Sequence, residues 1–146
     1  MGEVAEPEDV LTRGETRVAV GTALPTLVID LTPTFVISTA LATRDFTPVH
    51  HDTAVARAQG SADIFLNILT TMGLVERYVT DWTGPEAELR GIKVRLGVPA
   101  YAGDTLTFSG TVAEASGGEV TVEVTGAVSL GAHATATVRL ALPEAA

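Results

Sequence analysis

The spacing of apolar residues changes once along this chain, and that change constrains the fold more than any other feature. Across 61–80 the large apolar side chains recur at three- and four-residue steps, which is the period of an α-helix. Leu66 and Leu74 add apolar groups on other faces, so we expect this long helix to be mostly enclosed. The helical stripe comprises Ile64, Phe65, Ile68, Leu69, Met72, Val75 and Val79.

Beyond residue 86 the apolar residues alternate with polar ones, which is the period of a strand with one packed face. The pair Gly117–Gly118 is typical of a hairpin turn, and 99–104 is a second turn, rich in glycine and proline. We therefore expect antiparallel strands in meander order. They lie at about 90–98, 105–112, 120–130 and 134–140.

Shorter elements precede the long helix. We expect a short strand at 27–29 and a second strand at 34–39, where the residues are β-branched or aromatic. A helical turn is expected at 40–44, and a helix at 53–59 that Gly60 ends.

Together these elements predict an α+β protein of the hotdog type, in which an antiparallel β-sheet wraps around one long central helix. We expect a single domain over 17–146, preceded by an acidic, loosely ordered arm at 1–16. A single sheet of this kind leaves an edge strand and part of the helix uncovered, so we expect the domain to pair with a second subunit.

The composition excludes several classes of protein. A formal net charge of −9 argues against binding to nucleic acid, and the absence of cysteine excludes disulfides and thiolate chemistry. No apolar run approaches the roughly 18 residues of a membrane span, and the acidic residues near the amino terminus do not fit a signal peptide. We expect a cytoplasmic protein.

Titratable groups cluster in the stretch 45–52, within a chain that is only 18% charged. Asp45, His50, His51 and Asp52 lie within eight positions, and Pro48 bends the chain among them. A turn of this kind can bring Asp45 and His50 toward one point. A carboxylate beside an imidazole is a common arrangement for general acid–base chemistry on a water molecule.

The pattern Asp45-x-Thr47-Pro48-x-His50 resembles the D-x-N-P-x-H signature of MaoC-like, (R)-specific enoyl-CoA hydratases. The resemblance extends over most of the chain from about Gly21 and includes Pro99-x-x-x-Gly103-Asp104. Runs such as 38–46, 49–52, 59–65, 78–82 and 95–99 are more similar still to the small subunit of actinobacterial steroid side-chain enoyl-CoA hydratases.

Two departures from the family pattern are visible. The asparagine of the signature is Thr47 here, whose hydroxyl can also form local hydrogen bonds within a turn. The segment 52–60 is shorter than in general hydratases, which fits a bulky ring system in the substrate.

The resemblance implies that Asp45 and His50 activate a water molecule that adds across the double bond of an enoyl-CoA thioester. Backbone N–H groups of Gly60 and Ser61, at the expected start of the long helix, would stabilise the thioester oxygen. Arg57, Lys93 and Arg95, with Arg90, are candidates for contacts to the CoA phosphates. No cofactor is implied, because CoA belongs to the substrate. The implied partner is a larger MaoC-like subunit, in a heterotetramer, with a homodimer as the alternative.

Other interpretations of the same residues remain open. A hotdog thioesterase would use a carboxylate such as Asp63, and a non-catalytic subunit would only complete the pocket of its partner. A metal site at His50–Asp52 is disfavoured, because adjacent histidines point apart on an extended chain. We expect His51 to be structural or to face solvent, and His133 to face solvent. Asn67 and Thr71 are polar groups on a buried helix and must be hydrogen-bonded or functional.

Overall fold

The computed structural model describes residues 18–143, so the expected acidic arm at 1–16 lies outside the described residues. Three α-helices and a short 3₁₀ turn form one part of the structure: α1 (Pro33–Ala42), η1 (Pro48–His50), α2 (Thr53–Ala58) and α3 (Ile68–Thr83). The strands are β1 (Ala23–Asp30), β2 (Glu88–Leu96), β3 (Thr105–Ser116), β4 (Glu119–Val128) and β5 (Gly131–Ala141).

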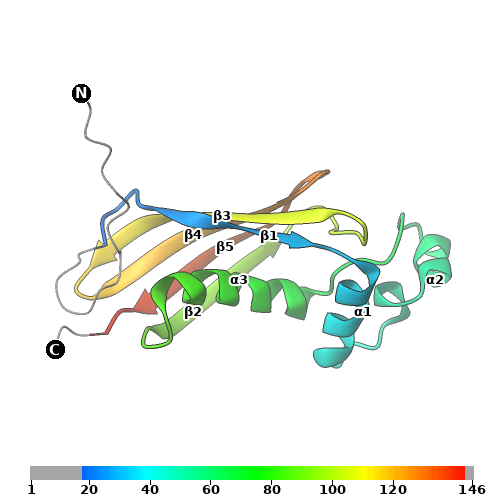
Figure 1. Cartoon of the computed structure of the whole chain (residues 1–146), viewed down its shortest axis with the longest axis horizontal. Helices are drawn as coiled ribbons and strands as arrows, with labels where there is room; N and C mark the ends of the chain where they lie inside the picture. The colour runs from blue at the N-terminus through cyan, green and yellow to red at the C-terminus, as the bar shows by residue number, and fades with distance from the viewer. Residues whose placement is uncertain (1–17, 144–146) are drawn as a thin grey trace.

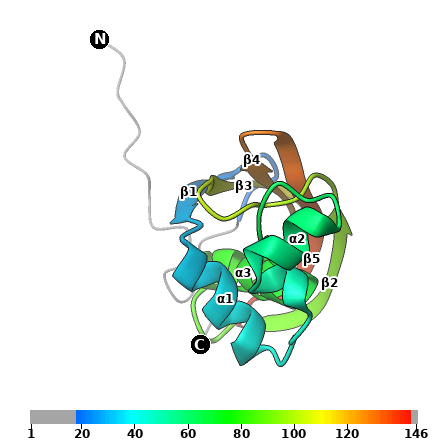
Figure 2. The same cartoon turned by 90° about the vertical axis from the view of Figure 1, so that its right-hand side faces the viewer.

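The strands form one antiparallel sheet in the order β1-β3-β4-β5-β2. Figure 1 shows α3 lying along one face of this sheet, with α1 and α2 beyond its amino-terminal end, and Figure 2 views the same arrangement from that end. The sheet and its single long helix confirm the predicted α+β hotdog fold.

The core lies between α3 and the sheet. Leu74, Val75 and Val79 on the helix are buried, as are the alternating apolar positions of β3, β4 and β5. Among the large side chains, Phe108 and Leu106 of β3 are completely buried. The alternation in the sequence therefore identified the packed face of each of these strands correctly.

The predicted meander is only partly correct. β3, β4 and β5 do follow one another, but β2 pairs with β5 at the far edge of the sheet instead of with β3. The turn at 97–104 carries the chain across the sheet from the edge strand β2 to β3, which lies next to the other edge strand, β1. Alternation shows which face of a strand is buried and says nothing of which strand lies beside it.

The predicted strand at 34–39 is wrong, because these residues belong to α1. The side chain of Thr32 accepts a hydrogen bond from the backbone N–H of Phe35, and Pro33 occupies the first turn. Both are strong signals for the start of a helix. They outweigh the β-branched composition of the segment, because tertiary packing on Val36 and Ala40 favours the helix.

The long helix begins at Ile68, seven residues later than predicted. The backbone N–H of Leu66 donates to the carbonyl of Ala100, and that of Ala102 donates to the carbonyl of Ile64. Residues 64–66 are therefore extended and paired with the turn at 97–104. Their buried side chains alternate, which is as consistent with an extended segment as with a helix.

Candidate active site

The loop that carries Asp45 begins at the carboxyl end of α1. Arg44 adopts a left-handed backbone conformation, with φ 57°. The N–H of Arg44 donates to the carbonyl of Leu41, and the N–H of Asp45 donates to the carbonyl of Ala40, at 2.9 Å. This pair of bonds is the Schellman arrangement that ends many helices. It ties the backbone of Asp45 to the last turn of α1.

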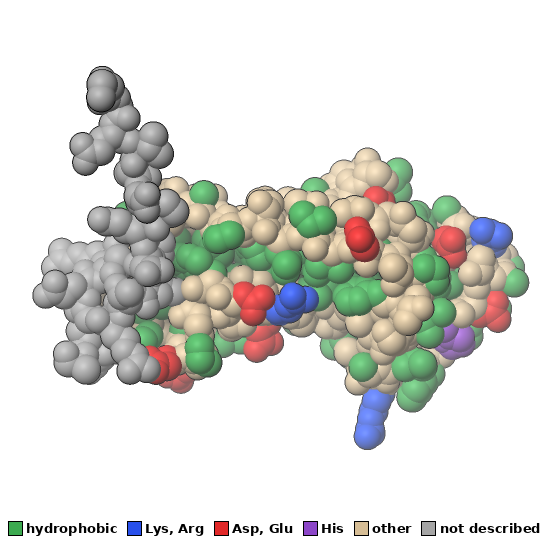
Figure 3. All heavy atoms as spheres, viewed as in Figure 1, with side chains coloured by type: hydrophobic (Ala, Val, Ile, Leu, Met, Phe, Trp, Pro, Cys, Tyr) green, Lys and Arg blue, Asp and Glu red, His purple; other side chains and the backbone are tan. Residues whose placement is uncertain are grey.

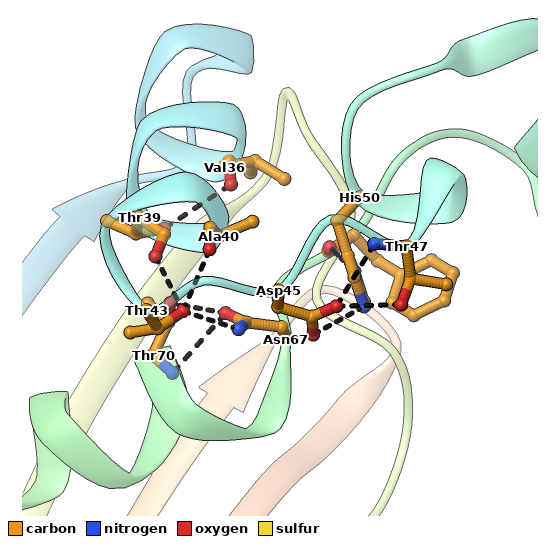
Figure 4. Close-up of polar contacts among 10 residues, drawn as sticks. Val36, Thr39, Ala40, Thr43, Asp45, Thr47, His50, Asn67 and Thr70 are labelled. Carbon is orange, nitrogen blue, oxygen red and sulfur yellow. Dashed lines mark hydrogen bonds and ion pairs between the residues drawn. The ribbon is translucent and has the colours of Figure 1, made fainter.

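Asp45 and His50 approach each other as predicted from the motif. Nε2 of His50 lies 3.3 Å from Oδ2 of Asp45, and Figure 4 shows the two side chains meeting on the bend between α1 and α2. Pro48 opens the short 3₁₀ turn that brings His50 back toward Asp45. His50 is buried and the Asp45 side chain is 23% exposed, so the pair lies at the edge of the protein interior.

The tautomer of His50 is set by its second ring nitrogen. Nδ1 of His50 lies 2.7 Å from the carbonyl oxygen of Phe65, which can only accept, so Nδ1 carries the proton. In the neutral ring Nε2 then presents a lone pair to Asp45. The ring of Phe65 also packs edge-on against the imidazole, with centroids 4.9 Å apart.

Phe65 is itself held by the turn at 97–104. It forms an antiparallel bridge with Tyr101, and their rings meet edge to face. The extended segment 64–66 thus has a role in orienting His50, which a helix at the same residues would not perform.

The Asp45 carboxyl has a pKa below its ordinary value. The main cause is the hydroxyl of Thr47, which donates to Oδ1 at 2.7 Å, and the Thr47 backbone N–H, His50 and the Asn67 side chain act in the same direction. Partial burial raises the pKa of the Asp45 carboxyl, but its effect is smaller than the combined effect of these groups. Asp45 is therefore a carboxylate at neutral pH.

When the His50 ring is neutral, its Nε2 and the Oδ2 of Asp45 are both hydrogen-bond acceptors. Two acceptors at this separation cannot bond to each other, but one water molecule can donate a hydrogen to each. The arrangement can hold a water molecule, orient its oxygen lone pairs away from the pair, and accept a proton from it.

Gly60 and Ser61 do not lie at the start of the long helix. They follow α2, and Gly60 has φ 96°, which ends that helix. The N–H of Gly60 donates to the carbonyl of Arg57 and the N–H of Ser61 donates to that of Ala56. Both N–H groups predicted to face a thioester oxygen are therefore engaged within the chain, and the geometric basis of that prediction was wrong.

The candidate cations are spread over two elements. Nε of Arg57, on α2, donates to the carbonyl of Ala62, while Arg90 on β2 pairs with Glu88. Lys93 and Arg95 are exposed on β2, the edge strand. Their predicted contacts to CoA phosphates stay predictions.

Two other sequence predictions concern titratable residues. The His133 side chain is buried, with 4% exposure, so the prediction that it faces solvent was wrong. Its Nδ1 is hydrogen-bonded to the carbonyl of Val98, and its Nε2 to the hydroxyl of Thr71. This contact also satisfies the buried Thr71. His51 is exposed, as expected. Asp63 precedes α3, and its carboxylate accepts from Thr53 and from the N–H of Ile64.

Within residues 18–143 no group of three or more potential metal-ligating side chains comes together, and none of the helices described is long and apolar enough to cross a membrane. Sequence reasoning missed the part that Phe65 plays at the site, because its carbonyl reaches His50 across 15 residues. No local signal marks such a contact.

Comparison with known proteins agrees with this architecture. Residues 17–134 match the model of the MaoC-like domain family. The chain is 58% identical over 125 residues to the 3-oxo-4,17-pregnadiene-20-carboxyl-CoA hydratase beta subunit of Mycobacterium tuberculosis, a match that covers 86% of this chain and 97% of that protein.

Solved structures of other proteins have the same fold. The crystal structure of the ChsH1-ChsH2 complex from M. tuberculosis matches with a TM-score of 0.84 at 58% identity, covering 86% of this chain and 98% of the matched chain. The (R)-hydratase from A. caviae matches with a TM-score of 0.79 at 19% identity, over 86% of this chain and 98% of that one, and shares the fold. The chain belongs to the MaoC-like domain family.

Proposed function

We propose that this chain is a subunit of an enoyl-CoA hydratase that adds water across the α,β double bond of a bulky, steroid-like acyl thioester of CoA. The observation that carries the proposal is the pairing of Asp45 with His50, in which Oδ2 and Nε2 lie 3.3 Å apart at the edge of the protein interior. The 58% identity to the mycobacterial hydratase beta subunit supports the substrate class.

In the proposed reaction the Asp45 carboxylate takes a proton from the bound water while the water oxygen attacks Cβ of the substrate. The π electrons move to Cα, and the thioester becomes enolate-like. His50 holds the water through Nε2. The proton taken from the water is then delivered from the Asp45–His50 pair to Cα, so one water molecule is added and both side chains return to their starting protonation states. A carboxylate with a lowered pKa is ionised at neutral pH, as the role of base requires.

Negative charge on the thioester oxygen requires donors, and the start of α3 supplies them better than Gly60 and Ser61. The first N–H groups of a helix have no acceptor within the helix, and the helix dipole is positive at this end. Asn67, which caps α3, lies beside Asp45 (Figure 4). We propose that the N–H groups of Ile68 and Leu69 serve the role assigned to an oxyanion hole.

Apolar side chains around the site favour an apolar acyl group. Phe46, next to Asp45, is 64% exposed, and Ile68 and Leu69 on the first turn of α3 are each 50% exposed. Figure 3 shows hydrophobic side chains exposed at the end of the molecule that carries α1 and α2, interspersed with acidic, basic and histidine side chains. Such a surface is covered in use by a partner, a substrate or both.

The proposal includes a larger MaoC-like subunit as partner, in a heterotetramer in the cytoplasm, with no cofactor beyond the CoA of the substrate. The ChsH1-ChsH2 complex of M. tuberculosis supports the presence of a partner subunit, and a homodimer is the alternative assembly. In either assembly this chain contributes the Asp45–His50 pair, and the neighbouring subunit completes the acyl pocket.

The test is co-purification with the larger subunit, followed by an absorbance assay for loss of the enoyl thioester with steroid and short-chain substrates. Asp45→Asn and His50→Ala should each lower kcat/KM by about 10²–10⁴-fold. Release of free CoA thiol from a saturated ester would instead indicate a thioesterase. Unchanged hydration in both variants would assign the chemistry to the partner chain.

A further inference from the structure

A single buried amide joins the start of α3 to the loop that carries Asp45. Asn67 is 2% exposed and lies at the N-cap of α3. Its side chain is bonded on both sides, to Thr70 of α3 and to Thr43 at the end of α1. Figure 4 shows this side chain between Thr43 and Asp45.

The orientation of the amide follows from its partners. The backbone N–H of Thr70 can only donate, so the atom that faces it at 3.3 Å must be the carbonyl oxygen Oδ1. The Thr70 hydroxyl meets the same oxygen. Nδ2 then points the other way and donates to the hydroxyl of Thr43 at 2.8 Å. The Thr43 hydroxyl in turn donates to the carbonyl of Thr39, at 2.8 Å, so it is free to accept from Asn67.

Capping α3 does not by itself require asparagine. Thr32 caps α1 and Asp52 caps α2, each with a side-chain oxygen and no donor nitrogen. What asparagine adds at the third cap is the NH₂ group. One of its hydrogens goes to Thr43, two residues before Asp45. The Asn67 side chain lies beside Asp45 (Figure 4), and it contributes to the lowered pKa of the Asp45 carboxyl, after the larger effect of Thr47.

We propose that Asn67 is a positioning residue for the reaction, whose amide holds the Asp45 loop against the first turn of α3 and donates to the carboxylate that activates water. This inference rests on the proposed hydratase function. The inference explains why the Asn67 amide is buried at this point. Asp45 lies on the loop after α1, whereas the proposed oxyanion donors lie at the start of α3, and Asn67 fixes the distance between them.

The test uses two variants that keep an oxygen at the N-cap. Asn67→Ser retains a good cap and loses both amide donors, and Asn67→Asp keeps the shape of the side chain but replaces the donors with a negative charge. In the complex with the partner subunit we expect kcat/KM at pH 6 to fall about tenfold for Asn67→Ser and further for Asn67→Asp. The acid limb of the pH profile should move to higher pH in the same order.

A second measurement does not depend on activity. With ¹³C-labelled aspartate in this chain alone, the carboxyl signal of Asp45, assigned by its loss in Asp45→Asn, should titrate at higher pH in both variants than in the wild type. Asp52→Ser, which changes the cap of α2, is the matched control and should leave both the profile and the titration unchanged.

Wild-type titration of Asp45 in Asn67→Ser would overturn the inference, as would a loss of activity of equal size at every pH. Absence of hydration by the wild-type complex would refute the proposed function instead, and the carboxyl titration would still decide whether Asn67 acts on Asp45.

Discussion

Thr47 is the main cause of the lowered pKa of the Asp45 carboxyl. Its hydroxyl and its backbone N–H both donate to Oδ1, which leaves Oδ2 turned to His50. The hydroxyl therefore substitutes for the side-chain amide that the family signature places in this turn. It both orients the carboxylate and stabilises its charged form.

Thr47→Val should raise the pKa of Asp45, because the largest cause of its depression is removed. Since the base must be deprotonated to accept a proton, the acid limb of kcat/KM should move to higher pH, with a smaller change above pH 8. Thr47→Ser keeps the hydroxyl and is the control. A pH profile of the valine variant that coincides with that of the wild type would mean that the Thr47 hydroxyl does not act on the catalytic carboxylate.

The sequence predicted the Asp45–His50 pair because both residues lie on one short turn, where local chemistry decides the geometry. It could not predict the groups that complete the site. The carbonyl of Phe65 reaches His50 only because 64–66 is paired with the turn at 97–104. The bond from Asn67 to Thr43 spans 24 residues. Both depend on how elements pack, which periodicity does not encode.

At the scale of elements, the same limit explains the misplaced start of α3. Ile64 and Leu66 fit a buried helix and an extended segment equally well, and only pairing with Ala100 and Ala102 decides between them. The strands β3, β4 and β5 were predicted well, because each has a long alternating pattern and short turns join them. The position of β2 depends on a connection across the sheet, which no local signal describes.

The turn at 97–104 depends on the lack of a side chain at Gly97. A Cβ placed there would lie 2.2 Å from the backbone carbonyl oxygen of Ala132. The backbone N–H of Gly97 also donates to the backbone carbonyl of His133, at 2.7 Å. Gly97→Ala should therefore destabilise the protein by about 2 kcal/mol or more, measured by chemical denaturation of the purified complex.

Gly91 on the adjoining strand provides the control for Gly97. A Cβ at Gly91 would meet only the end of the Arg139 side chain, at 3.1 Å, and that side chain can move. Gly91→Ala should change the stability by less than about 0.5 kcal/mol. Equal effects of the two substitutions would mean that close backbone approach at Gly97 does not limit the fold.

Asp104 joins the same turn to the hairpin between β4 and β5. Its carboxylate accepts from the hydroxyl and the N–H of Ser129 and from the N–H of Thr105, with the Ser129 hydroxyl as the main cause of its lowered pKa. A depressed pKa means that the stabilisation is present above the unfolded pKa and is lost as pH falls through the folded one.

Asp104→Asn should therefore lower the thermal midpoint most at neutral pH, and the difference from the wild type should shrink as the pH falls below 4. Thermal melts of both proteins between pH 3 and 7 measure this. Asp30→Asn, which removes a carboxylate at the end of β1, is the matched control. A midpoint difference for Asp104→Asn that is constant over this range would contradict the assignment to the ionised carboxylate.

At the scale of the whole molecule, the two edges of the sheet differ. β2 forms one edge and β1 the other, and the first turn of α3 exposes Ile68 and Leu69. Open edge strands and an exposed apolar helix turn are surfaces that pairing with another subunit would protect. The site lies at that same first turn, so the partner that covers it also bounds the substrate pocket.

Leu69→Glu should therefore weaken assembly with the larger subunit, because the new carboxylate would be buried against an apolar surface or would keep the subunits apart. The dissociation constant, measured by analytical ultracentrifugation or by pull-down of the partner, should rise by about tenfold or more. Val28→Glu, at an apolar position on the edge strand β1 that is 60% exposed against 50% for Leu69, should leave assembly unchanged. If both variants assembled like the wild type, the partner would have to bind elsewhere, and the exposed first turn of α3 would then be left to contact the acyl group alone.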